Sequence, residues 1–158
     1  MTTIPKAMGV VPVEAFKTAS GLEVLQRMLA GELPAPPITA VLPFTLSEAE
    51  AGRVVFEGEP TAELLNPMGA VHGGFAMTLL DSAMTCAVIS VLGAGEGCTT
   101  IETKVNFVRA LMPSTGPVRA EARLIHGGAR VATAEGRVLD TAGRIYAHGT
   151  STCLRFPL

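Results

Sequence analysis

The sequence has no tryptophan, one tyrosine and only three cysteines among its 158 residues. Cys86, Cys98 and Cys153 are odd in number and far apart, and no Cys-x-x-Cys pair occurs, so neither a disulfide framework nor a zinc site is indicated. We expect reduced, mostly buried thiols, because a cysteine in an apolar segment is most often a small core residue. A reactive cysteine nucleophile is the alternative.

Clusters of basic charge are also missing. Twelve Lys and Arg residues against fourteen Asp and Glu residues give a formal net charge of -2. Without a basic block that would attract a phosphate backbone, we expect no nucleic-acid binding. The start, MTTIPKAMGVVPVEAFK, lacks the charged and apolar regions of a signal peptide, and its prolines are expected to interrupt any helix. These absences predict a cytoplasmic protein.

Hydrophobic residues make up 48% of the chain, which is enough for one domain with a core. A chain of 158 residues is too short for two such domains. Within that single domain we expect a helical extension over residues 1–35, followed by the main body over residues 36–158. In the extension, Ser20 is placed to cap a helix whose apolar residues recur at helical spacing, and Gly31 and Pro34 end it.

The next segments predict a hairpin and one strongly apolar helix. Residues 38–52 and 53–60 have the pattern of two strands, the first kinked by Pro43 and therefore expected at a sheet edge. Residues 74–92 are apolar all around, which predicts a helix buried on nearly every side. A transmembrane helix is the competing interpretation, but Asp81 near its middle would cost about 2.5–3.5 kcal/mol. We therefore expect no membrane partner.

Four further segments have the alternation of strands. In TTIETKVNFVRA, alternate residues from Ile101 to Phe107 would face the core. PVRAEARLI, ARVATAEGRVLD and RIYAHGTSTCLR follow, the last two joined by a tight turn at Thr141 to Gly143. The order of segments predicts an α+β fold, with an antiparallel β-sheet of about five to six strands wrapped around one long central helix, plus an N-terminal helix.

The motif His-Gly-Gly occurs twice, and only one copy indicates chemistry. At His126 to Gly128 the glycines lie between two strands, where a hairpin turn uses their access to positive φ, so His126 needs no catalytic role. At His72 to Gly74 the glycines open the apolar helix instead. The free backbone N–H groups and positive end of such a helix suit an oxygen that gains negative charge.

Asp81 is the one carboxylate inside this apolar helix. Ser82 and Thr85 are close enough in sequence to satisfy it as a structural residue. However, no Lys or Arg lies within ten residues on either side, and an unpaired buried carboxylate is costly. A carboxylate near an anion-binding helix start favours a general base or nucleophile. Asn66 and His72 alone are ordinary loop residues.

The combined spacing resembles a known family. A loop and helix start with the pattern Asn66-x-x-Gly69-x-x-His72-Gly73-Gly74 come first. The single carboxylate Asp81 follows within the helix, and the strand TTIETKVNFVRA comes after the helix. Over roughly residues 20–155 the chain is similar to the PaaI-like branch of the hot-dog-fold acyl-CoA thioesterases. The resemblance implies a hot-dog fold and hydrolysis of a coenzyme A thioester with no metal and no cofactor besides the coenzyme A of the substrate.

The resemblance also implies catalytic roles. Asp81 would act as general base or as nucleophile, and the Gly73 N–H would polarise the thioester carbonyl. Asn66 and His72 would position the reacting groups. A Ser or Thr near the start of the next strand often assists, and Thr100 is the better match for that residue here.

Thr99 is the alternative to Thr100, and the resemblance assigns Thr99, Gly74 and Arg109 to substrate binding. Relatives often have Arg-Pro where this chain has Arg109-Ala110, so the shape of that turn is open. The three scattered His and three scattered Cys offer no ligand set with metal spacing, so we expect no metal.

Helix length adds a geometric argument. Gly73 and Asp81 are eight residues apart, which at about 1.5 Å per residue is roughly 12 Å along a helix. One reacting carbon cannot touch both. We therefore expect a homodimer with a shared active site, and exposed edge strands also favour subunit pairing. Whether dimers assemble into a tetramer is open.

Two other functions are alternatives. An enoyl-CoA hydratase-like enzyme would need an Asp and a His close together, which Asp81 and His72 do not indicate. A non-catalytic acyl-CoA-binding module would accompany a DNA-binding part, and the first 35 or so residues have no basic cluster. The aromatic content of six Phe, one Tyr and no Trp does not tell whether the acyl group is aliphatic or aryl. The role of the N-terminal helix is equally open.

Overall fold

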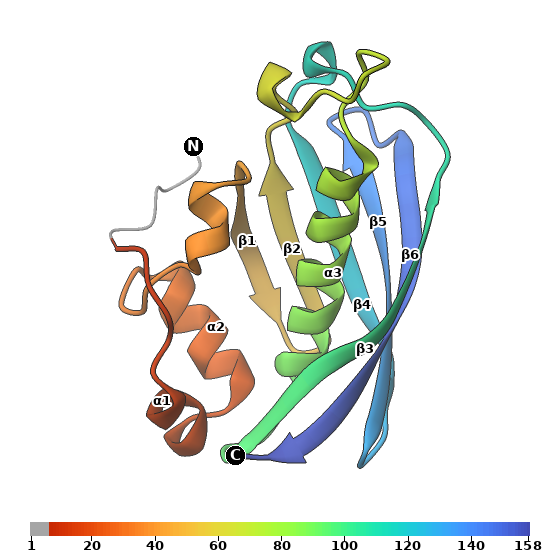
Figure 1. The fold of residues 1–158 in the computed structure, drawn as a ribbon. Coiled ribbons are helices and arrows are strands. Elements are labelled where there is room, and N and C mark those ends of the chain that lie inside the picture. Colours follow the sequence, from red (N-terminus) through yellow and green to blue (C-terminus); the bar gives the residue numbers. More distant parts are fainter. Residues whose placement is uncertain (1–6) are drawn as a thin grey trace.

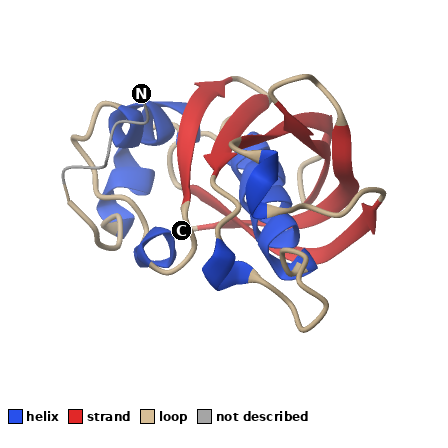
Figure 2. Cartoon of the chain, turned by 90° about the horizontal axis from the view of Figure 1, so that it is seen from above, coloured by secondary structure: helices blue, strands red, loops and turns tan. Residues whose placement is uncertain are grey.

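The computed structural model describes residues 7–158 and confirms the α+β architecture. Six strands form one antiparallel sheet in the order β1-β2-β4-β5-β6-β3. This sheet curls around the long helix α3, which lies in its concave face (Figures 1 and 2). Residues 1–6, the start of the predicted extension and of the segment examined for a signal peptide, lie outside the described part.

The helices are α1 (Val13–Thr18), α2 (Gly21–Leu29) and α3 (Gly73–Ile89), with 3-10 turns η1 (Pro37–Ala40), η2 (Ala62–Leu64) and η3 (Pro113–Thr115). The strands are β1 (Phe44–Glu50), β2 (Arg53–Gly58), β3 (Glu96–Phe107), β4 (Val118–Gly127), β5 (Val131–Asp140) and β6 (Ile145–Pro157). In residues 7–158, no helix has the length and apolar character needed to cross a membrane.

The N-terminal helices lie beside β1, at one side of the sheet (Figure 1). The Ser20 cap is confirmed: its side chain accepts from the Glu23 N–H while the Glu23 carboxylate accepts from the Ser20 N–H, which satisfies two helix-end donors. As expected, no helix runs through Pro12 in the described part of this segment. Helix α1 begins directly after Pro12, where the missing N–H of proline costs no helical hydrogen bond.

The first hairpin is confirmed, with a shorter first strand than expected. Residues Pro37–Ala40 form a 3-10 turn, and β1 begins at Phe44 after Pro43. Proline cannot donate a ladder hydrogen bond, so the strand starts beyond it. As predicted, β1 is an edge strand.

Helix α3 is buried on one side rather than all around. The buried side faces the sheet and consists of Phe75, Ala76, Leu79, Leu80, Ala83, Met84, Ala87 and Val88. On the other side Met77 is 40% exposed and Asp81 is half-buried. The prediction of burial on nearly every side is therefore wrong for the single chain, because one sheet covers only one face of a helix.

The expected core face of β3 holds only in part: Val105 is half-buried and packs against the core, but both ends of the expected face are exposed. Ile101 is 57% exposed and Phe107 is 52% exposed. β3 is the second edge strand, and its pairing with β6 shifts register between Thr100 and Glu102. A bulge of this kind changes which residues face which side, so one alternation does not extend across it.

The second His-Gly-Gly forms the predicted hairpin turn, between the end of β4 at Gly127 and the start of β5 at Val131. The expected reason is wrong, because neither Gly127 nor Gly128 has a positive φ. A Cβ atom on Gly128 would instead lie 2.5 Å from the Val131 carbonyl oxygen. Glycine is required there by close backbone approach.

A Gly21→Ala variant tests how α2 is attached. The Gly21 N–H donates to the Leu92 carbonyl at 3.0 Å, and a Cβ at this position would lie only 1.9 Å from the Ile89 carbonyl oxygen. We expect Gly21→Ala to lower the free energy of unfolding by at least about 2 kcal/mol, measured by urea denaturation, because α2 must move off the end of α3. The exposed control Gln26→Ala should change it by less than about 0.5 kcal/mol. Equal stability of both variants would contradict this packing.

Candidate active site

The residues predicted to form the site fall into two groups along α3. A cavity of about 550 Å³ lies between α2, β1 and the middle of α3, and Asp81, Thr99 and Thr100 line it. A smaller cavity of about 270 Å³ lies at the start of α3 and is lined by Asn66, His72, Gly73 and Arg109. The single chain therefore brings the carboxylate and the helix start to different cavities.

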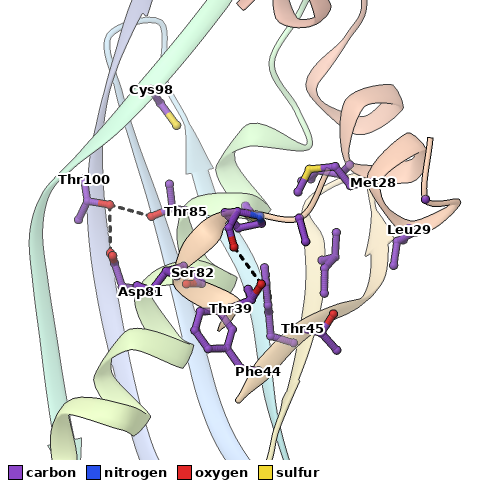
Figure 3. A pocket seen from close by; sticks show the side chains of 18 of the residues that line it. Met28, Leu29, Thr39, Phe44, Thr45, Asp81, Ser82, Thr85, Cys98 and Thr100 are labelled. Atoms are coloured by element: carbon purple, nitrogen blue, oxygen red, sulfur yellow. Dashed lines mark hydrogen bonds between the residues drawn. The ribbon is translucent and has the colours of Figure 1, made fainter. Parts of the chain in front are cut away.

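Two threonine hydroxyls of β3 hold the Asp81 carboxylate. Its Oδ1 accepts from Thr100 Oγ1 at 3.1 Å and from Thr103 Oγ1 at 3.3 Å, and Thr100 Oγ1 lies 2.7 Å from Thr85 Oγ1 (Figure 3). Within residues 7–158 every hydrogen bond of this carboxylate goes to Oδ1. Oδ2 is thus left without a protein donor, which suits a group that takes up a proton.

Thr103 is the contact that sequence reasoning missed. In a regular strand, residues three apart face opposite sides, so Thr100 and Thr103 would not reach one carboxylate. The bulge at Ile101 turns both hydroxyls to the α3 side. Thr103 also lies 3.2 Å from Ser151 Oγ of β6, which in turn donates to the Glu102 carbonyl. Sequence alternation alone carries no signal for this bulge.

The larger cavity contains no compensating cation. Its lining includes no Lys, Arg or His, and Asp81 forms no ion pair in the part of the chain that the structure describes. Cys86 and Cys98 also line it as free thiols. Burial, and then the nearby Asp81 charge, raises the pKa of Cys86 to about 12. A hydrogen bond with Cys153 raises the pKa of Cys98. At neutral pH these two thiols stay protonated, which disfavours the cysteine-nucleophile alternative for them.

At the start of α3, His72 caps the helix. Its Nδ1 accepts from the Gly74 N–H at 2.9 Å, so the ring proton of a neutral His72 is on Nε2. The Gly74 N–H is therefore already used in the hydrogen bond that caps the helix. The Gly73 N–H has no acceptor within residues 7–158. The ring of Phe107 packs beside Gly73, 3.2 Å from where a Cβ would be.

Asn66 holds the loop that leads into α3. Its Oδ1 accepts from the Met68 N–H at 2.9 Å and the Ala70 N–H at 3.2 Å. Gly69 completes this turn with a φ of 82°, a conformation that glycine adopts without strain. The loop thus fixes the entry of α3 and leaves the side-chain NH2 group of Asn66 outside these two bonds.

Arg109 lines the smaller cavity together with this loop. Its guanidinium is 5.7 Å from the centre of the Tyr146 ring, a cation–π distance. The N–H groups of Val108 and Arg109 both donate to the Tyr146 carbonyl. The turn that contains Ala110 is therefore held by backbone contacts without the proline that relatives often have. Within residues 7–158, no group of three or more His, Cys, Asp or Glu is arranged to hold a metal ion.

Similar proteins share this fold. A solved phenylacetic acid degradation-related protein from Ralstonia eutropha is 30% identical, with a TM-score of 0.74, over 82% of this chain and 98% of that chain. The PaaI protein of E. coli, from the phenylacetic acid degradation operon, has a TM-score of 0.68 over 75% of this chain and 83% of its own. At 21% identity, that second likeness concerns the fold alone. Both support the predicted hot-dog fold, and the resemblance to PaaI-like proteins is confirmed.

A curated protein of Halobacterium salinarum, named as an esterase, is 34% identical over 88 residues. These residues are 54% of this chain and 56% of the relative, so the chain spans about half the length of the curated relative it matches. The model of the thioesterase superfamily matches residues 68–147, which contain the start of α3, Asp81 and the threonines that hold it. By this match the chain belongs to the thioesterase superfamily.

Proposed function

We propose that the protein hydrolyses an acyl-CoA thioester with Asp81 as the catalytic carboxylate. The observation that carries the proposal is the setting of Asp81: a carboxylate without a cationic partner, oriented through one oxygen by Thr100 and Thr103, in the wall of a mostly apolar cavity. Such a group is able to remove a proton from water or to attack a carbonyl carbon itself.

In the general-base version, Asp81 takes a proton from water as the water oxygen bonds to the thioester carbonyl carbon. The carbonyl oxygen becomes negatively charged, and the unused Gly73 N–H at the positive end of α3 is suited to stabilise it. Collapse of this intermediate breaks the carbon–sulfur bond, and the proton passes to the departing thiolate. The products are the free acid and coenzyme A. In the nucleophile version, the Asp81 carboxylate attacks the carbonyl carbon, the carbon–sulfur bond breaks and coenzyme A leaves as the thiolate. Water then hydrolyses the resulting anhydride to the free acid and the Asp81 carboxylate.

A second copy of the chain is needed to bring these groups together. Gly73 and Asp81 line different cavities, and eight residues of helix span about 12 Å. The edge strand β3 supports such pairing, because its Ile101 and Phe107, and Val108 directly after it, are all more than half exposed. A two-fold axis beside β3 would place the Gly73 of one protomer opposite the Asp81 of the other.

The site gives less support to hydratase chemistry. Within one chain His72 and Asp81 line different cavities, and the Nδ1 of His72 accepts from the Gly74 N–H, which leaves only Nε2 for acid–base chemistry. The test of the proposal is a set of purified acyl-CoA substrates, aliphatic and aryl, with release of free thiol as the readout. Turnover supports a thioesterase. Saturable acyl-CoA binding without thiol release would instead favour the binding module.

Metal removal should leave hydrolysis intact. The proposed chemistry uses a carboxylate and a backbone N–H, and neither requires a Lewis acid. We expect less than about a twofold change in kcat/KM after incubation with EDTA and dialysis, measured with the same thiol readout. Loss of activity that one added divalent metal restores would overturn this expectation.

A further inference from the structure

The N-terminal helix does more than cover the sheet, because it forms one wall of the larger cavity. Leu25, Met28 and Leu29 of α2 line the cavity, as do Ala35 and Pro36 of the connector that follows. Asp81 and Thr100 line the same space from α3 and β3 (Figure 3). The carboxylate and the N-terminal layer therefore enclose a single volume.

The wall is firmly attached. Ser20 and Glu23 cap the start of α2, Gly21 rests directly on the end of α3, and Leu25 is only 2% exposed. These contacts hold α2 against the end of α3 and the core. The cavity is then bounded at a set depth, and its 550 Å³ falls within the range of about 300–1,000 Å³ typical of small-molecule sites.

The lining is chemically selective. Its α2, β1 and β2 parts are dominated by apolar side chains, including the tilted ring pair Phe44 and Phe56. Asp81 is the only charged residue in the described lining. A carboxylate at the far end of a substrate would lose its water without gaining a cation, and it would be repelled by Asp81.

Resting on the proposed function, we propose that this cavity accepts the acyl group of the thioester, that the group is neutral and apolar, and that Met28 of α2 sets its greatest length. Met28 is half-buried and its side chain extends from α2 toward the cavity (Figure 3). Its flexible, unbranched side chain is suited to packing against the end of an alkyl chain.

The proposal predicts a chain-length profile that substitutions at Met28 displace. With straight-chain acyl-CoAs of increasing length, kcat/KM should rise about three- to fourfold per methylene until the cavity is filled, and then fall. Met28→Trp should lower the ratio of long-chain to short-chain kcat/KM by at least about tenfold, because the indole occupies the end of the cavity. Met28→Ala should move the optimum to longer chains. Succinyl-CoA should be at least about tenfold poorer than butanoyl-CoA.

The matched control is Gln26→Trp, which adds the same ring to α2 at an exposed position outside the cavity lining. It should leave the length profile unchanged. Circular dichroism checks that each variant is folded, and if Met28→Trp is not, Met28→Ala alone decides the matter. Hydrolysis with the same optimum in the folded Met28 variants and wild type would overturn the role of Met28. A preference for succinyl-CoA would overturn the neutral acyl group.

A second readout separates this inference from the proposed function. Neutral n-alkanols of increasing length serve as probes of the cavity without coenzyme A, with binding measured by calorimetry. Wild-type protein should show a length limit that Met28→Trp shortens. If alkanols bind with that limit and no acyl-CoA is hydrolysed, the proposed function fails while the apolar cavity limited by Met28 stands. If acyl-CoA is hydrolysed and the alkanol limit is the same in the Met28 variants, the inference fails by itself.

Discussion

A folded Asp81→Asn protein is expected to hydrolyse acyl-CoA at least about 100-fold more slowly than wild type. Asparagine has nearly the same volume, and its side-chain oxygen still accepts hydrogen bonds from Thr100 and Thr103, so the cavity wall stays intact. What is lost is the negative charge that takes up a proton or attacks carbon. The measurement is kcat from steady-state thiol release, with circular dichroism to verify the fold.

The control for this loss is His126→Ala. His126 lies at the exposed end of β4, in the hairpin copy of His-Gly-Gly. The turnover of the His126→Ala variant should stay within about threefold of wild type, since His126 lines neither cavity. Near-normal turnover in folded Asp81→Asn would remove Asp81 from the catalytic role. A large, selective loss in His126→Ala would instead mean that the second copy is the functional one.

The second large effect concerns the shared site, which predicts recovery of activity from two inactive variants. Asn66→Asp keeps the oxygen that Met68 and Ala70 use, so the loop should hold, but it replaces the donating NH2 group with a negative charge. Asp81→Ala removes the carboxylate. Each homodimer should be nearly inactive, because every one of its sites carries one defect.

In a mixed dimer of these variants, one site carries both defects and the other carries neither. The purified mixed dimer, made by co-expression with two different tags, should have about half of wild-type activity. After random mixing of equal amounts, about half of the dimers are mixed and activity should reach about one quarter. A confirmed mixed dimer without recovery would refute the shared site and leave the thioesterase proposal to be tested separately.

Local sequence signals predicted the elements of the fold well. Ser20 with Glu23 starts α2, the apolar segment after His72 forms α3, and the turn at Gly143 has the positive φ that glycine favours. Each of these depends on interactions among residues close in sequence, such as capping and turn geometry. Given the order of the elements, one sheet packed around one helix is among the few arrangements that bury the apolar faces of both.

The site was predictable only in part. His72, Gly73 and Asp81 stand out in the sequence because polar groups in an apolar segment need a reason. How they are held did not follow from the pattern. The capping bond from the Gly74 N–H to His72 and the turn around Asn66 are visible only once the loop is folded.

The sequence by itself determined which segments form α2, α3 and the strands, that α3 carries one carboxylate, and that Gly73 and Asp81 lie too far apart for one thioester. These follow from short-range periodicity and helix rise. Only the tertiary structure decided that Thr103 joins Thr100 on Asp81, that the outer residues of β3 are exposed, and that α2 forms a cavity wall. The reason is that register and docking are set by partners distant in sequence: β3 pairs with β6, and α2 rests on the end of α3.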